Sequence, residues 1–135
     1  MLERAMGLAE KAFEGKVDPK GQPYLNHSIR VMEKMDTEEE KTVAMLHDIV
    51  EDTDTTLRDL QNAGFPREVL EAVEQLTKKL NMTYFDYIED IASSELAKKV
   101  KLAEIDDNMD EVRVAKMSFK TFLLRSAENV LKKSS

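Results

Sequence analysis

The stretch that decides the fold lies near the middle of the chain and reads Met45-Leu46-His47-Asp48-Ile49-Val50-Glu51-Asp52-Thr53. It holds one of the two histidines of the chain, and an aspartate follows that histidine directly. If the stretch is helical, its four polar side chains before Thr53 occupy an arc of about 140° on one side. A solvated helix face does not normally carry a His-Asp pair inside an apolar run. The stretch therefore predicts the floor of an active site.

The overall composition limits the class of protein. A chain of 135 residues, 41% of them hydrophobic, is expected to form a single domain over residues 1–135 with a real core. The net charge of -7 argues against nonspecific binding to nucleic acid or to an anionic membrane, although it allows a local basic pocket. The absence of cysteine excludes disulfides and thiolate metal sites. No signal-peptide core or membrane-spanning run is visible, so we expect a soluble cytoplasmic protein.

Helical periodicity extends over most of the chain, and strand signals are weak. We therefore expect an all-α fold, a compact bundle of several helices. Thr37 and Glu40 have the spacing of a capping box, and Ser93 or Ser94 can cap a later helix. The expected helices cover about residues 2–14, 24–35, 37–47, 55–64 and 66–79, then a helix from 81 or 83 through 91, then 95–109, and a last one that Ser118 opens, 119–132.

The two histidines allow two interpretations. A lone histidine is more often a buried side chain satisfied by one hydrogen bond, but the neighbouring carboxylates of His47 favour a metal site, which needs nitrogen and oxygen ligands from several elements. A second acidic cluster, Val100 to Asp110, is either a solvated helix end or the source of a further metal-binding carboxylate. Within this cluster Glu104 shares a helix face with Lys101 and with Asn108.

Three segments resemble the HD-domain metal-dependent phosphohydrolases, and within them the RelA/SpoT-type hydrolase domain and its small single-domain relatives. The segment 46–53, Leu-His-Asp-Ile-Val-Glu-Asp-Thr, is very similar to the Leu-His-Asp-(Thr/Val)-Val-Glu-Asp-Thr of that family. The segments 15–27, which ends in Pro-Tyr-Leu-Asn-His, and 100–109, which begins Val-Lys-Leu-Ala-Glu, resemble two others in the same order. The resemblance covers roughly residues 5–110 and implies an HD-type helical bundle.

The resemblance also implies roles for individual residues. It implies a divalent metal, manganese in this family, with ligands His27, His47, Asp48 and Glu104. It implies that Glu51 and Asp52 position or activate the attacking water. The candidate substrate contacts are Lys16, Lys20, Tyr24, Lys78, Lys101 and Asn108.

The leading hypothesis is a pyrophosphohydrolase that acts on a nucleotide similar to guanosine 3′,5′-bis(diphosphate). One alternative is a phosphohydrolase with another nucleotide substrate. A second alternative is a nucleotide-binding or regulatory domain without turnover, because Glu104 stands where the family usually has aspartate, and Asp106 and Asp107 add negative charge nearby. Phe13 and Lys16 also depart from the histidine and glutamine that the family often has. The oligomeric state stays open, and self-association is compatible with the sequence.

Overall fold

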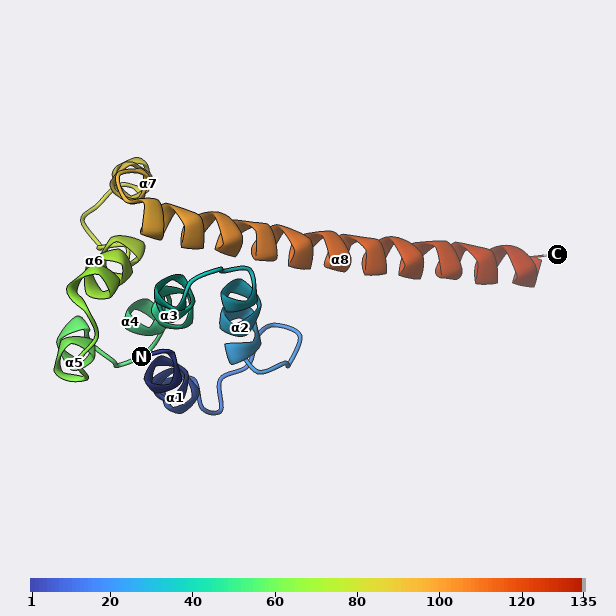
Figure 1. The fold of residues 1–135 in the computed structure, drawn as a ribbon. Coiled ribbons are helices and arrows are strands. Elements are labelled where there is room, and N and C mark those ends of the chain that lie inside the picture. Colours follow the sequence, from blue (N-terminus) through green and yellow to red (C-terminus); the bar gives the residue numbers. More distant parts are fainter. Residues whose placement is uncertain (135) are drawn as a thin grey trace. The chain divides into compact units, whose positions relative to one another are not determined.

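The fold is all-helical, as the sequence predicts. The computed structural model describes residues 1–134, and it describes only the backbone of residues 111–116, 118, 133 and 134. The helices are α1 (Leu2–Ala12), α2 (Leu25–Glu33), α3 (Glu38–Leu46), α4 (Ile49–Asp52), α5 (Leu57–Asn62), α6 (Arg67–Leu76), α7 (Tyr84–Ala92) and α8 (Glu95–Ser134) (Figure 1). Extended pairing within residues 1–134 is limited to an isolated bridge between Val17 and Pro23.

The chain divides into two units. The first, Met1–Glu104, contains seven helices and the beginning of α8, and the second, Ile105–Ser135, continues α8. Within the described residues no helix is both long and apolar enough to cross a membrane. The hydrophobic core and the candidate site belong to the first unit.

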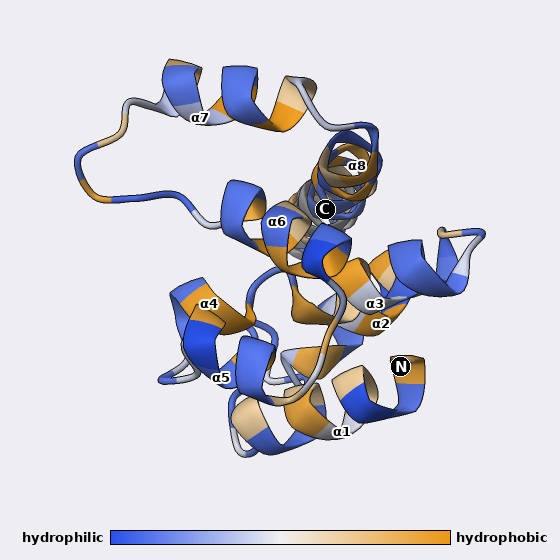
Figure 2. Cartoon of the chain, turned by 60° about the vertical axis from the view of Figure 1, so that its left-hand side comes forward, coloured by the Kyte–Doolittle hydropathy of each residue, from blue (hydrophilic) through white to orange (hydrophobic). Residues whose placement is uncertain are grey.

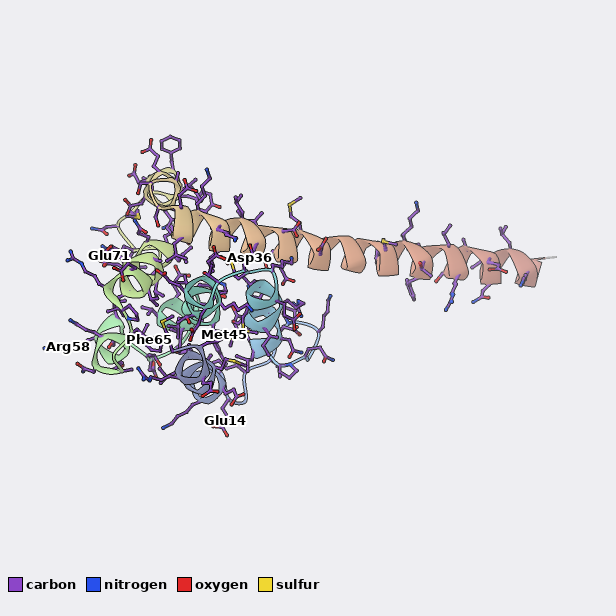
Figure 3. The ribbon with its side chains drawn as sticks, in the orientation of Figure 1. Glu14, Asp36, Met45, Arg58, Phe65 and Glu71 are labelled. Carbon is purple, nitrogen blue, oxygen red and sulfur yellow. The ribbon has the colours of Figure 1, made fainter. Side chains whose placement is uncertain are left out.

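Helix α3 lies at the centre of the first unit, packed against α1, α2 and α6. Thr37 and the side chain of Glu40 form the predicted capping box, and the five residues 42–46 that end the helix are all buried. Figure 2 shows apolar residues gathered where α1, α2 and α3 meet. Met45 of α3 and Phe65 point into this interior, whereas Arg58 and Glu71 point outward (Figure 3). Helix α3 is thus packed on several sides, and His47 follows directly at its C-terminal end.

Several helix ends differ from the prediction by a few residues. α5 is capped by Thr56, not Thr55, because Asp59 stands three residues further on and completes a second capping box. α6 ends at Leu76 and not near Lys79, since Thr77 adopts an extended conformation. Of the two serines proposed as the cap of α8, Ser94 accepts the hydrogen bond, from the backbone N–H of Ala97.

Two predictions of helix extent are wrong. The helix expected over 37–47 stops at Leu46, so His47 and Asp48 form a turn before the short α4. The two helices expected over 95–109 and 119–132 are one continuous helix, α8. Its sequence contains neither glycine nor proline, and the serine at position 118 alone is too weak a signal to end the helix.

Candidate metal centre

Four side chains that the sequence singled out come together in the first unit. His27 lies on α2, His47 and Asp48 form the turn between α3 and α4, and Glu104 lies on α8. One ligand atom of each lies within 4.8 Å of the others. The Asp48 Oδ2 atom is 3.0 Å from Nε2 of His47 and 3.6 Å from Nε2 of His27. Glu104 Oε2 is 3.8 Å from Nε2 of His47.

His47 is the most deeply buried member of the cluster, with 1% of its surface exposed. Its Nδ1 atom pairs with the backbone carbonyl of Ala44, one turn earlier on α3, at 2.5 Å. Its Nε2 atom faces the carboxylates, and among the described side chains it is one of two buried polar atoms without a hydrogen bond of good geometry. A histidine that donates from one ring nitrogen to a carbonyl presents the other as a ligand lone pair. The ring is therefore oriented as a metal ligand.

The charges of the cluster act on this imidazole. Burial lowers the pKa of His47, but the carboxylates of Asp48 and Glu104 outweigh it and raise the pKa to about 9. Burial also acts against ionisation of Asp48, and the neighbouring histidines more than offset it, so that the pKa of Asp48 lies below its usual value. The site thus attracts positive charge. A divalent metal ion held by the four side chains would supply that charge.

The donor set fits a divalent metal ion. Two imidazole nitrogens and two carboxylate oxygens suit several borderline-to-hard ions. Two atoms bound to one ion at about 2.1 Å can be at most about 4.2 Å apart, and the separations of 3.0, 3.6 and 3.8 Å given above fall inside that limit. The cluster can therefore close on an ion with small side-chain movements.

Glu104 is held in place by a short relay of hydrogen bonds. Lys101, three residues earlier on α8, donates to Glu104 Oε2 at 3.3 Å and to the Tyr87 hydroxyl at 3.3 Å. Tyr87 in turn donates to the backbone carbonyl of Leu76, at 2.8 Å. Burial lowers the pKa of Lys101, but Glu104 and Tyr87 together outweigh this effect and the pKa is raised. Lys101, expected to contact substrate phosphate, therefore stays charged and directs its ammonium group at a candidate ligand.

Tyr24 connects the four candidate ligands to the carboxylate at the end of α4. Its hydroxyl donates to Asp52 Oδ2 at 2.9 Å and lies 3.3 Å from Asp48 Oδ2. Burial and the charge of Asp48 raise the pKa of Tyr24, so the phenol keeps its proton. Asp52 lies four residues after Asp48, and the single turn of α4 places both on the side that faces Tyr24.

Glu51 is held by a backbone group that follows α6. Its carboxylate accepts the backbone N–H of Lys78, just after α6, at 2.5 Å. Burial raises the pKa of Glu51, the bond from Lys78 lowers it, and the charges of Asp48 and Asp52 raise it, with a net increase. A carboxylate whose pKa is raised is a better proton acceptor. The role of Glu51 in activating water stays a prediction.

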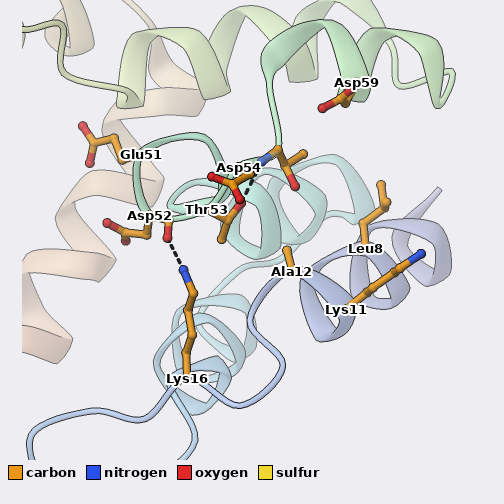
Figure 4. A pocket seen from close by; sticks show the side chains of 10 residues that line it. Leu8, Lys11, Ala12, Lys16, Glu51, Asp52, Thr53, Asp54 and Asp59 are labelled. Carbon is orange, nitrogen blue, oxygen red and sulfur yellow. Dashed lines mark hydrogen bonds between the residues drawn. The ribbon is translucent and has the colours of Figure 1, made fainter.

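A pocket of about 640 Å³ opens beside Glu51 and Asp52 (Figure 4). Leu8 and Ala12 of α1 form its apolar wall, and Lys16 crosses it to donate to the backbone carbonyl of Asp52. We call its carboxylates the acidic rim: Glu51, Asp52, Asp54 and Asp59. More negative than positive side chains line this pocket.

The remaining substrate candidates are less confined. Lys20 is exposed, and its backbone N–H donates to the side chain of Asp18. The side chain of Lys78 is also exposed and donates to the carbonyl of Lys79. Asn108 is exposed and belongs to the second unit. Roles in substrate binding for these three side chains stay predictions.

The sequence reasoning did not find the supporting groups. The Ala44 carbonyl, which orients His47, is a backbone atom and leaves no trace in the pattern of side chains. The link of Tyr87 to Lys101 joins two helices across 14 positions. The pairing of Tyr24 with Asp52 spans 28 positions. Such contacts become visible only when the helices are in place.

Comparison with known proteins agrees with this geometry. A family profile described as an HD domain matches residues 5–133. The chain belongs to the HD-domain family. It is 32% identical over 110 residues to the bifunctional (p)ppGpp synthase/hydrolase SpoT of Escherichia coli, which covers 78% of this chain and 15% of that protein. It is 39% identical over 116 residues to the human guanosine-3′,5′-bis(diphosphate) 3′-pyrophosphohydrolase MESH1, covering 77% of this chain and 64% of MESH1.

A solved structure shares the fold. It belongs to a metazoan ortholog of SpoT that hydrolyzes ppGpp, with a TM-score of 0.73 and 28% identity over 84% of this chain and 70% of that one. The chain thus spans a small part of the bacterial HD-domain relatives and about two thirds of MESH1. The family and the fold are the parts of the sequence-based resemblance that are confirmed.

Proposed function

We propose that the chain is a metal-dependent pyrophosphohydrolase that acts on guanosine 3′,5′-bis(diphosphate). The observation that carries the proposal is the convergence of His27, His47, Asp48 and Glu104 within 4.8 Å. The similarity to SpoT and MESH1, whose names include this nucleotide, supports the choice of substrate.

His27, His47, Asp48 and Glu104 would hold the ion, which we propose to be Mn²⁺. A bound divalent ion lowers the pKa of water and polarises a phosphoryl oxygen. The protein provides the rest of the chemistry. Glu51 accepts the proton of the attacking water, for which its raised pKa is suited. Asp52 orients that water from the end of α4.

The position of Glu104 favours turnover over a domain that only binds nucleotide. A glutamate one methylene too long could turn away from the cluster, but Lys101 holds this carboxylate 3.8 Å from His47. This position supports the proposal that Glu104 takes the place of the family's aspartate as the fourth ligand.

The test is hydrolysis by the purified chain with Mn²⁺. Guanosine 3′,5′-bis(diphosphate) is the substrate, and pyrophosphate and GDP are measured, with a panel of other nucleotides in parallel. We expect release of pyrophosphate that stops on addition of a chelator and in His47→Gln, while circular dichroism shows that the variant is folded. Wild-type protein that releases no pyrophosphate would refute the proposal. Faster release from another nucleotide would retain the enzyme class and change the substrate.

A further inference from the structure

The hydroxyl of Tyr24 lies between two carboxylates with different tasks. Its oxygen is 2.9 Å from Oδ2 of Asp52 and 3.3 Å from Oδ2 of Asp48. A phenol has one proton to donate, so it serves one carboxylate at a time. The shorter distance assigns the proton to Asp52. Asp48 Oδ2 is already the atom that faces both histidines.

The ring that carries this hydroxyl is well fixed. Tyr24 stands at the start of α2, three residues before His27, and its ring packs at 5.0 Å against the ring of Phe13, which is 3% exposed. Asp52 is the last residue of the one-turn helix α4 and is exposed. An exposed carboxylate at the end of such a short helix has little else to hold its rotamer. The contact from Tyr24 ties it to the rigid part of the first unit.

We propose that Tyr24 is a positioning residue that acts through Asp52, and that it does not serve as a contact for the substrate. The inference rests on the proposed function, because Asp52 matters only if water is activated beside the cluster. Tyr24 holds Asp52 in one orientation next to Asp48. It also places a hydrogen-bond donor between two negative charges that would otherwise repel each other.

The same geometry argues against a direct role in substrate binding. A phosphate oxygen is an acceptor, as are both carboxylates that already surround the hydroxyl. A substrate phosphate that took the phenolic proton would leave Asp52 without its bond from Tyr24 and would bring a third negative group to the same point. That arrangement would lose one hydrogen bond for the one it gains and would add electrostatic repulsion.

Steady-state kinetics of Tyr24→Phe separate the two roles. Loss of one hydrogen bond to a charged group is expected to lower kcat about 10- to 100-fold, while KM stays within about twofold. Tyr84→Phe is the matched control, because Tyr84 is 62% exposed and loses the same hydroxyl. Its kcat and KM are expected to equal those of the wild type. A raised KM with unchanged kcat in Tyr24→Phe would show a substrate contact and overturn the inference, and so would unchanged values of both.

A double-mutant cycle tests whether Tyr24 acts through Asp52. In an Asp52→Asn background, Tyr24→Phe is expected to change kcat less than threefold, because the two residues act as a unit. A full 10-fold loss in that background overturns the inference. If Tyr24→Phe does not fold, Phe13→Leu loosens the same ring and replaces it in the cycle with the same criterion. Wild-type protein without activity refutes the proposed function itself, whereas an active wild type with an unaffected Tyr24→Phe refutes this inference alone.

Discussion

The substitution Glu104→Asp tests whether the position of the carboxylate in the cluster depends on the length of the glutamate side chain. The substitution removes one methylene and draws the carboxylate back by roughly 1.3 Å, since a C–C bond is about 1.5 Å long. The present distance of 3.8 Å between Glu104 Oε2 and His47 Nε2 would grow to about 5 Å. Two ligands of one ion at about 2.1 Å cannot be more than about 4.2 Å apart. The variant therefore loses its fourth ligand unless the backbone of α8 moves.

The size of the effect follows from that loss. Changes in the groups that merely support metal ligands cost about 10- to 100-fold in affinity, so loss of a ligand is expected to cost at least this much, about 1.4 to 2.7 kcal/mol. Isothermal titration calorimetry with Mn²⁺ measures it directly. Glu95→Asp is the matched control, because Glu95 is exposed in the first turn of the same helix.

The result can also refute the reasoning. If Glu104→Asp binds Mn²⁺ as tightly as the wild type, or more tightly, the carboxylate at position 104 is not placed by its length and by the ion pair with Lys101. The site would then be a weakened form of the aspartate site that the family usually has. Because the measurement uses metal alone, this outcome is independent of which nucleotide the chain hydrolyses.

Three further predictions concern metal, pH and substrate. At a Mn²⁺ concentration 100 times the Kd, binding of the ion adds about 2.7 kcal/mol to the free energy of unfolding. Differential scanning calorimetry should record this as a Tm higher by about 10 °C. EDTA should reverse the increase, and His47→Gln should not show it. Lys99 holds the pKa of Glu40 at about 2, below its ordinary 4.5, so their pair adds stability above pH 4.5 that disappears as the pH falls toward 2. Because Lys99 is 38% exposed, solvent screens the pair and we expect the effect to be small; urea titrations of Glu40→Gln should lack this pH dependence. Equilibrium dialysis should show that a non-hydrolysable analogue of guanosine 3′,5′-bis(diphosphate) binds only with Mn²⁺, because the acidic rim repels it; equal binding in EDTA would contradict this.

The parts of the site that the sequence predicts are those with local signals. His47 and Asp48 are adjacent, so their proximity needs no tertiary information. His27 is the other histidine of the chain, and the resemblance to the family linked it to them. For Glu104 the residues alone left two interpretations open, and packing of α8 in the first unit places it in the cluster. A surface helix end and a metal-binding helix have the same local pattern of charges.

The errors of the prediction have a common physical origin. Ser118 and Thr55 are residues that favour helix starts, but a local preference of this kind is worth only about 1 kcal/mol. An uninterrupted run without glycine or proline outweighs it in α8, and the reciprocal bond from Asp59 shifts the start of α5 to Thr56. The turn at His47 and Asp48 shows no breaking residue at all. Such a turn leaves no local signal in the sequence.

The contacts of the lysines around the site limit how a polyphosphate could be recognised. Lys101 is committed to Glu104 and Tyr87, and Lys16 donates to the Asp52 carbonyl. Of the lysines that the resemblance assigned to phosphate, this leaves Lys20 and Lys78, which are exposed and screened by solvent. The acidic rim adds negative charge on the pocket side. Close to the cluster, a cation held by its two imidazoles and two carboxylates would offset this negative charge, so we expect the ligand set to govern the binding of a pyrophosphate group as well as its hydrolysis.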